Sequence, residues 1–256
     1  MLPARLVPVP ALADNYIWLL ADDEGAAIVV DPGEAAPVER VLRRDGLALQ
    51  AILLTHHHGD HIGGAAELAA ASGAPVYAPR DPRIGLDARR VGDGECVVLE
   101  APALDLDVLE VPGHTATHIA FFGNGVLFSG DTLFSVGCGR LFEGTPAQML
   151  ASLDRLAALP GDTLLCCGHE YTVANCAFAI GQEPGNAALA ERAAQAANQR
   201  AAGQATVPVT LDVERATNPF LRIDAPELAM ALGQGERVAR FAELRRRKDD
   251  FRMPAR

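Results

Sequence analysis

Short apolar runs bounded by turn residues recur through the first two thirds of the chain. Runs of this length are typical of β-strands. They lie at residues 15–20, 26–30, 51–54, 107–111, 118–122, 125–129 and 163–167. Several of them end in Asp-Pro-Gly, Pro-Gly-His, Gly-Asp or Gly-His, combinations that mark sharp turns out of a strand. The pattern therefore predicts a strand in each run.

Helical patterns alternate with these strands and then replace them. Helices are expected at 36–44, 60–72 and 146–158. Beyond residue 168, the segment 186–202 is rich in Ala, Glu, Arg and Gln, and 226–248 has the pattern of one or two further helices. We therefore expect an α/β (α+β) domain at 1–168 and a smaller, mostly helical domain at 169–256.

Composition and charge narrow the class of protein. The chain of 256 residues is long enough for a well-buried core, and its net charge of −11 argues against a nucleic-acid ligand. No apolar run approaches the ~18 residues of a membrane span, and the first ten residues lack the apolar core of a signal peptide. The five cysteines are odd in number and have no short repeated spacing, so we interpret them as reduced thiols in a cytoplasmic protein.

Four of the seven histidines lie within Thr55–His61, directly after the apolar run 51–54. A surface tract resembling a tag is the alternative, but it would not lie between a strand and a helix. In an extended chain His56 and His58 point to the same side, and His57 points away. The pair can therefore share one metal ion. Asp60 and His61 follow where the chain turns into the helix, and can address a second ion.

Three more polar residues follow an apolar strand and a glycine, namely His114, Asp131 and His169. Several strands can bring such residues to one rim of a sheet. Taken alone, Asp131 fits a turn or a helix cap equally well. The recurrence of the pattern favours a shared site.

The run Thr55–His61 resembles the HxHxDH signature of the metallo-β-lactamase superfamily, and the later ligand candidates occur in the order that this superfamily uses. The resemblance implies its αββα sandwich and a centre of two divalent metal ions. One metal would be held by His56, His58 and His114, the other by Asp60, His61 and His169, and Asp131 would bridge both. His57 would not be a ligand, and His118 would have a structural role. Asp60 and Asp131 are thereby the expected catalytic residues.

Narrower motifs resemble the glyoxalase II (hydroxyacylglutathione hydrolase) family. They extend from the metal motif to the C-terminal region and lie at 113–119 (GHTATHI), 128–134 (FSGDTLF), 137–144 (GCGRLFEG), 167–172 (CGHEYT), 217–222 (TNPFLR) and 247–251 (RKDDF). Two positions depart from the family pattern. Thr117 stands where the family often has Gly, and Phe142 stands where some members have a Tyr that helps to hold glutathione.

This resemblance implies hydrolysis of S-(2-hydroxyacyl)glutathione thioesters, such as S-lactoylglutathione, in the second step of methylglyoxal detoxification. A metal-bridging hydroxide would attack the thioester carbonyl and release glutathione and a 2-hydroxy acid. The thiolate leaves easily, so no separate protonated acid is required. Zinc is the expected metal, with iron and manganese as alternatives.

Glutathione carries two carboxylates, for which a basic clamp is suited. By motif, the clamp would consist of Arg140, Arg245 and Lys248, with a hydrogen bond from Tyr171 and with Phe142 beside them. Without the resemblance, the basic run 245–248 would be interpreted as a solvated helix end. We expect a monomer with a small-molecule substrate and no membrane or nucleic-acid partner.

The alternative functions are those of a sulfur dioxygenase, a nuclease and a scaffolding protein. A sulfur dioxygenase acting on glutathione persulfide with a single iron would share most of the ligands, but the helical region with its basic tail favours the thioesterase. A nuclease of the same superfamily would need an inserted domain and basic surfaces. A scaffolding protein without catalysis would be expected to lack some of the seven ligand positions, all of which are filled here.

Overall fold

A computed structural model describes residues 5–233 and 235–253, and within it the chain forms two compact units. Unit 1 comprises Met1–Glu110, Thr117–Gly130 and Cys166–His169. Unit 2 comprises Val111–Ala116, Asp131–Leu165 and Glu170–Arg256. The backbone therefore passes between the units at five points along the sequence. The expected outer domain limits, residues 1 and 256, lie outside the described residues.

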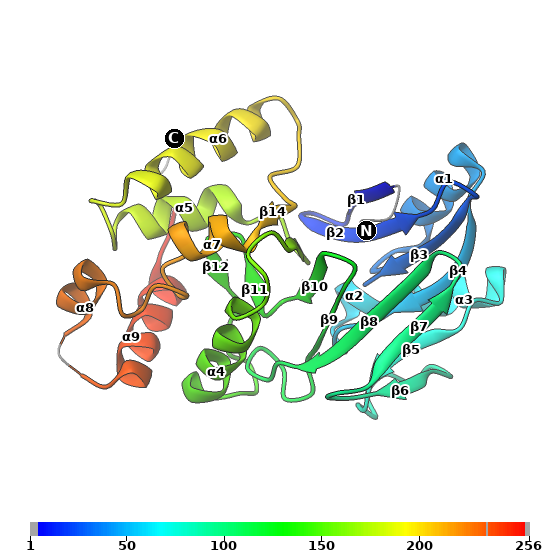
Figure 1. Ribbon diagram of the computed structural model, residues 1–256, viewed down its shortest axis with the longest axis horizontal. Coiled ribbons are helices and arrows are strands. Elements are labelled where there is room, and N and C mark those ends of the chain that lie inside the picture. Colours follow the sequence, from blue (N-terminus) through cyan, green and yellow to red (C-terminus); the bar gives the residue numbers. More distant parts are fainter. Residues whose placement is uncertain (1–4, 234, 254–256) are drawn as a thin grey trace. The chain divides into compact units, whose positions relative to one another are not determined.

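Unit 1 contains a six-stranded sheet whose strands follow their order in the sequence (Figure 1). The strands are β1 (Arg5–Ala11), β2 (Asn15–Ala21), β3 (Ala26–Val30), β4 (Ala48–Leu53), β5 (Val76–Pro79) and β6 (Arg89–Val91). The first three are antiparallel, and β3 to β6 are parallel. The parallel connections include the helices α1 (Ala35–Asp45), α2 (Gly59–Ile62) and α3 (Ala65–Ser72). Parallel strands require such crossovers.

A second sheet in unit 1 is built from antiparallel hairpins. Its strands are β7 (Cys96–Glu100), β8 (Ala103–Glu110), β9 (Ile119–Gly123) and β10 (Val126–Gly130). Strand β13 (Leu164–Cys167) lies next to β10 and contributes Cys166 and Cys167 to this unit. On β8, buried and exposed residues alternate, as expected for a strand with one face on the core.

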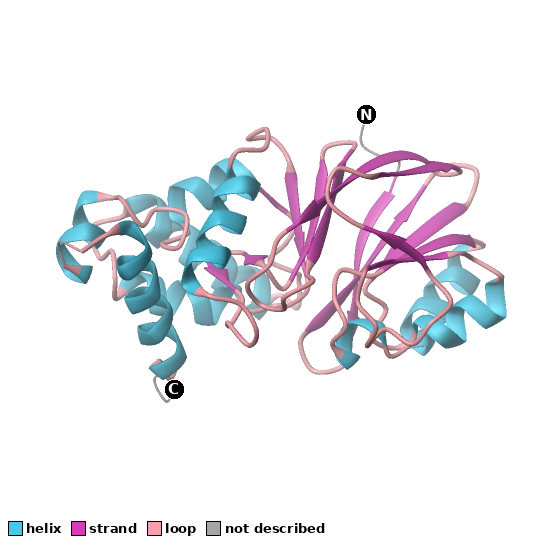
Figure 2. Cartoon of the chain, turned by 90° about the horizontal axis from the view of Figure 1, so that it is seen from below, coloured by secondary structure: helices cyan, strands magenta, loops and turns pink. Residues whose placement is uncertain are grey.

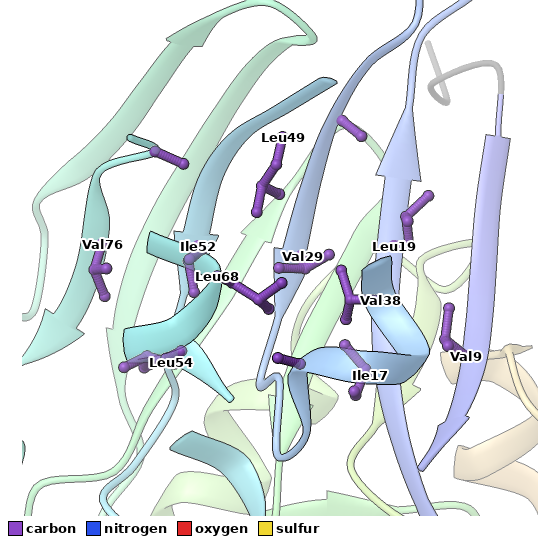
Figure 3. Packing of buried hydrophobic residues seen from close by; sticks show 14 of the residues in the cluster. Val9, Ile17, Leu19, Val29, Val38, Leu49, Ile52, Leu54, Leu68 and Val76 are labelled. Atoms are coloured by element: carbon purple, nitrogen blue, oxygen red, sulfur yellow. The ribbon is translucent and has the colours of Figure 1, made fainter. Parts of the chain in front are cut away.

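Strand β2, the second in the six-stranded sheet, is buried along its whole length. Ile17 and Leu19 belong to an apolar cluster that Val38 of α1 and Leu68 of α3 complete (Figure 3). Between them in the sequence, the indole Nε1 of Trp18 donates to the Cys167 carbonyl of the second sheet at 2.9 Å. Because one side of β2 packs on helices and Trp18 reaches the other sheet, unit 1 is layered as helices, sheet and sheet.

Unit 2 is mostly helical (Figure 2). Its helices are α4 (Pro146–Ala157), α5 (Thr172–Ile180), α6 (Ala187–Ala201), α7 (Leu211–Thr217), α8 (Pro226–Leu232) and α9 (Arg237–Asp250). Helix α4 begins with a capping box between Thr145 and Gln148 and has proline in its first turn. The β-structure of this unit is a small hairpin, β11 (Leu133–Phe134) and β12 (Gly137–Cys138), and the pairing of β14 (Val209–Thr210) with the start of β13.

The mixed α/β class, with two sheets and a helical C-terminal region, is confirmed. All seven predicted strands are present, although their limits shift by up to several residues. The single helix predicted at 60–72 is wrong, because the chain breaks into α2 and α3 at Gly63 and Gly64. A Cβ atom at Gly64 would lie 2.3 Å from the backbone nitrogen of Ala35, so the close approach of the loop before α1 interrupts the helix.

The division at residue 168 into two domains stays a prediction, since unit 2 also includes segments that precede it. None of the helices in the described part of the chain combines the length and hydropathy needed to cross a bilayer.

Candidate metal centre

Three electron-pair donors converge in unit 1 where α2 begins and β13 ends. The Nε2 atoms of His61 and His169 are 3.3 Å apart, and each lies 3.5 Å from Oδ2 of Asp60. Both imidazoles are buried, whereas the Asp60 side chain is 41% exposed. The two imidazoles are therefore enclosed, whereas the Asp60 carboxylate is accessible to a small molecule.

Hydrogen bonds on the far side of each ring determine which nitrogen carries the proton. Nδ1 of His61 lies 3.0 Å from Oδ2 of Asp31, and Nδ1 of His169 lies 2.9 Å from Oδ1 of Asp14. Carboxylates accept hydrogen bonds, so both Nδ1 atoms donate and both Nε2 atoms present lone pairs. This is how proteins orient imidazoles that bind metals.

Two lone pairs and a carboxylate oxygen at such distances repel one another unless a cation lies between them. Nitrogen ligands about 2.0–2.1 Å from a tetrahedral zinc ion lie about 3.3 Å apart. The separation of His61 Nε2 and His169 Nε2 has this value. The three donors, Asp60, His61 and His169, therefore fit a divalent metal ion.

A second pair of imidazoles lies just before α2. Nε2 of His56 is 3.1 Å from Nδ1 of His58. The Thr55 hydroxyl donates to Oδ2 of Asp31 at 2.7 Å and lies 3.0 Å from Nδ1 of His56, from which it accepts. The same carboxylate thus fixes the proton of His56 through Thr55 and that of His61 directly.

Asp31 is itself close enough to His56 and His61 to be considered a ligand. However, its two oxygens already accept from the Thr55 backbone, the Thr55 hydroxyl and His61. The residue is buried and has a φ of +54°, an uncommon conformation outside glycine. We interpret it as an anchor for the ligands.

The two other histidines of unit 1 have different surroundings. Nδ1 of His57 lies 3.4 Å from Oδ2 of Asp81, and the ring of His118 stacks on His56 with centroids 4.6 Å apart. Asp81 also accepts from the Thr117 hydroxyl at 2.5 Å. Hydrogen bonding from Arg83 holds the pKa of Asp81 well below its usual range. Thr117, one of the two departures from the family pattern, therefore makes a hydrogen bond that glycine could not make.

Unit 2 brings His114 and Asp131 together. Nε2 of His114 lies 3.4 Å from Oδ2 of Asp131, and Nδ1 donates to the Arg140 carbonyl at 2.9 Å. A Cβ atom at Gly139 would lie 1.9 Å from the Asp131 carbonyl oxygen, so only glycine fits there. As in unit 1, Nδ1 is anchored and Nε2 faces a second potential ligand.

Two of the expected substrate residues meet at one carboxylate. Nε of Arg140 and Nη2 of Arg245 lie 3.2 Å and 3.1 Å from Oδ1 of Asp249. The Arg140 side chain is 56% exposed, whereas Arg245 is buried and donates to the Cys138 carbonyl at 2.8 Å. Arg140 can reach a ligand in solvent, and Arg245 also supports the loop that holds His114.

Lys248 lies among aromatic rings. Its Nζ is 5.3 Å from the Phe178 ring centroid and 5.4 Å from that of Phe251. Burial, assisted by the nearby charge of Arg245, lowers the pKa of Lys248 to about 8. Its charge is therefore sensitive to pH near neutrality.

The remaining two substrate candidates are aromatic. The Tyr171 ring packs edge-on against Phe134 at 5.3 Å. Phe142 is 61% exposed, and its ring lies 5.3 Å from that of His114. A large exposed aromatic side chain beside a ligand candidate can form one wall of a substrate site.

Three residues that orient the donors, Asp14, Asn15 and Asp31, were not predicted from the sequence. Asn15 donates to Oδ2 of Asp60 at 3.0 Å, and the two aspartates orient His169 and His61. Asp31 directly follows an apolar strand, although without the glycine that precedes His114, Asp131 and His169, so part of this signal was present. Asp14 precedes β2 and Asn15 is its first residue, where the pattern gives no such signal.

Comparisons with known proteins agree with this geometry. A model of the metallo-beta-lactamase superfamily matches residues 13–169, and a model described as hydroxyacylglutathione hydrolase C-terminus matches residues 170–251. The chain is 54% identical to the hydroxyacylglutathione hydrolase of Xanthomonas euvesicatoria pv. vesicatoria over 97% of this chain and 99% of that protein.

Solved structures show the same fold. ETHE1 from Myxococcus xanthus matches with a TM-score of 0.63 and 24% identity, over 89% of this chain and 97% of that one. TTHA1623 in a di-iron-bound form matches with a TM-score of 0.59 and 28% identity, over 86% of this chain and all of that one. With the resemblance from sequence motifs confirmed over nearly the full length, the chain belongs to the hydroxyacylglutathione hydrolase family of the metallo-beta-lactamase superfamily.

Proposed function

We propose that this chain hydrolyses S-(2-hydroxyacyl)glutathione thioesters, such as S-lactoylglutathione, to glutathione and a 2-hydroxy acid. This reaction is the second step of methylglyoxal detoxification. The observation that carries the proposal is the triangle of donors on Asp60, His61 and His169, with each imidazole proton directed away from it. Such a centre suits metal-assisted hydrolysis, and the relatives at about half identity are named for hydrolysis of this substrate class.

The proposed centre holds two divalent metal ions. Asp60, His61 and His169 would hold one of them, and His56, His58 and His114 the other, with Asp131 shared. The course of the backbone supports this grouping. Asp131 directly follows Gly130 of unit 1, and the segment 111–116, which contains His114, is joined to unit 1 at both ends. The donor spacing favours zinc, and this set of nitrogen and oxygen ligands also tolerates iron and manganese.

Bound metal ions would supply an activated water and polarise the thioester carbonyl. The chain's own contribution is to keep the ligands in position. Asp31 and Asp14 hold the Nδ1 protons of His61 and His169, and Asn15 holds the Asp60 carboxylate. Because these partners are hydrogen bonded before substrate arrives, little reorganisation is needed during the reaction.

Substrate would be held by Arg140, Arg245, Lys248, Tyr171 and Phe142. Arg140 has the exposure required for a carboxylate of glutathione, and Lys248 supplies a second positive charge below its pKa. Arg245 would hold the clamp in place, because its buried guanidinium bonds both the Cys138 carbonyl and Asp249, which also accepts from Arg140. The exposed Phe142 ring would cover the acyl group of the thioester.

We also propose that the enzyme is a cytoplasmic monomer. None of the five cysteines, all of which lie in the described part of the chain, forms a disulfide, as expected for a reducing compartment. The net charge of −11 and the pairing of several surface arginines with carboxylates argue against a nucleic-acid partner.

The test is a pair of assays on zinc-loaded and iron-loaded protein. One follows thioester loss with S-lactoylglutathione, and the other follows oxygen uptake with glutathione persulfide. We expect thioester hydrolysis with either metal and no oxygen uptake. Oxygen uptake by the iron-loaded protein without thioester hydrolysis would instead identify a persulfide dioxygenase.

A further inference from the structure

The hairpin β11–β12 lies between Asp131, one potential metal ligand of unit 2, and the residue that orients His114, the other potential ligand. It begins just after Asp131 and ends just before Gly139 and Arg140, whose carbonyl accepts the His114 proton. The Gly139 backbone nitrogen donates to the Thr132 carbonyl at 3.1 Å, which closes the loop at its base. The position of the hairpin therefore determines how His114 faces Asp131.

The turn of this hairpin is strained. Val136 has a φ of +57°, which is the left-handed region. A β-branched side chain rarely adopts this conformation, because it brings the side chain too close to the backbone. Such a turn persists only where surrounding interactions hold it.

A buried carboxylate provides that hold. Glu214 of α7 is fully buried, and its Oε2 accepts from the Val136 backbone nitrogen at 2.7 Å. Its Oε1 accepts from the Ser135 hydroxyl, also at 2.7 Å. Glu214 therefore contacts both central residues of the turn.

Two further side chains complete the network. Nδ2 of Asn218 lies 3.0 Å from Glu214 Oε2 and 3.1 Å and 3.0 Å from the carbonyls of Phe134 and Gly137, so these three acceptors share its two N–H groups. Arg192 of α6 donates to the Ser135 hydroxyl at 3.1 Å and supplies a positive charge. Burying a carboxylate is costly unless several donors satisfy it. The donors around Glu214 therefore hold its carboxylate, and with it the turn, in one position.

We propose that Glu214 is a positioning residue for the metal centre, which it serves by holding the strained turn at Val136. The proposal rests on the proposed function only in that His114 and Asp131 bind metal. Loss of Glu214 would let the backbone at Val136 leave the left-handed conformation. This change would shift the hairpin and, at its two ends, Asp131 and the Arg140 carbonyl. Metal affinity would fall even though no ligand is changed.

The experiment compares zinc release to a chelator, melting temperature and steady-state kinetics in full-length variants. Glu214→Ala should release one zinc ion at a chelator concentration about 10- to 100-fold lower, as is typical for loss of an outer partner of a metal ligand. Glu214→Gln retains an oxygen for the Val136 nitrogen and should lie closer to the wild type. Val136→Gly removes the strain, so adding it to Glu214→Ala should restore most of the zinc affinity.

Glu183→Ala is the matched control. Glu183 is also buried in unit 2, and its carboxylate accepts from Arg222 at 3.0 Å rather than from the hairpin. It should lower the melting temperature and leave zinc release unchanged. Should Glu214→Ala not fold, Ser135→Ala serves in its place, with an expected shift of about twofold to tenfold.

Three results would overturn the proposal. They are unchanged zinc release in the Glu214 and Ser135 variants, an equal shift in Glu183→Ala, and no recovery on adding Val136→Gly. Zinc release needs no substrate, so its outcome is independent of the thioesterase assay. A wild-type protein that binds zinc but leaves S-lactoylglutathione intact would refute the proposed function and leave the role of Glu214 standing.

Discussion

The two units hold their metal-ligand candidates by different means. In unit 1, carboxylates bind the imidazoles directly, since Asp31 and Asp14 accept from His61 and His169. In unit 2, His114 donates to the backbone carbonyl of Arg140. That carbonyl belongs to a loop whose position depends on the buried side chain of Glu214.

This difference has a physical consequence. A carboxylate bonded to an imidazole stabilises the ligand electrostatically and fixes its proton at once. A backbone carbonyl fixes only which imidazole nitrogen carries the proton. The carbonyl itself is correctly placed only when its loop is correctly folded. The ligands of unit 1 should therefore tolerate distant changes, whereas those of unit 2 should be sensitive to them.

The largest effect is expected for Asp131→Ala. This change removes the carboxylate proposed to be shared by both metals, so turnover should be lost and metal content should fall. The loss should exceed the 10- to 100-fold typical of an outer partner. Metal analysis with S-lactoylglutathione kinetics checks it, and unimpaired turnover would refute the shared role.

Next in size are Asp31→Ala and Asp14→Ala, which test the carboxylate anchors of unit 1. Asp31 supports both His61 and, through Thr55, His56, and it is 4% exposed; the Asp14 side chain is 43% exposed and supports only His169. We expect about a 100-fold loss of metal affinity for Asp31→Ala and about 10-fold for Asp14→Ala. Chelator competition measures both, and the reverse order would contradict the anchor assignment.

The substrate clamp gives the third comparison. Lys248→Ala should mainly raise KM, because the charge binds ground state and transition state alike. Arg245→Ala should raise KM and also lower stability by about 1–3 kcal/mol, because it leaves the buried Cys138 carbonyl without its donor. Kinetics and thermal unfolding separate the two effects. A fall in kcat alone for Lys248→Ala would count against its place in the clamp.

A smaller effect is expected from pH. The pKa of Lys248 is about 8, so its ammonium group is charged below that value and loses its proton above it. KM for the anionic substrate should therefore rise as pH increases through about 8, and Lys248→Arg should flatten this rise because arginine stays charged. A constant KM for the wild type across this range would show that the lysine charge does not hold substrate.

The smallest effect is expected for Thr117→Val. It removes the hydrogen bond to Asp81 at 2.5 Å while keeping the side-chain shape. Stability should fall by about 1–2 kcal/mol, and activity should change little, because His57 is not a proposed ligand. Thermal unfolding with parallel kinetics provides the test. A large loss of activity without loss of stability would instead give the Asp81–His57 contact a role in the metal centre.

Much of the fold could be predicted because its strands are apolar runs bounded by turns. Seven strands in the described part of the chain were not predicted. Two prolines interrupt β1, β5 has four residues and ends in proline, and β6 and β7 are short and carry charged residues. Each of β11, β12 and β14 has only two residues. The break between α2 and α3 could not be predicted from local pattern, because its cause is a loop near Ala35, far away in the sequence.

The site shows the same limit. Residues that follow a strand and a glycine, such as His114 and His169, were predictable by position and motif. The partners that orient them were not, because hydrogen bonds such as His169 to Asp14 join residues more than a hundred positions apart. Glu214 gave no signal at all, since a single glutamate in a helix is ordinarily a solvated residue.

The most direct test of the central claim is metal stoichiometry measured with activity on the same sample. The full-length protein should contain about two divalent metal ions per chain, lose S-lactoylglutathione hydrolysis when they are chelated, and regain it on addition of zinc. Full hydrolysis by protein freed of metal would contradict the account.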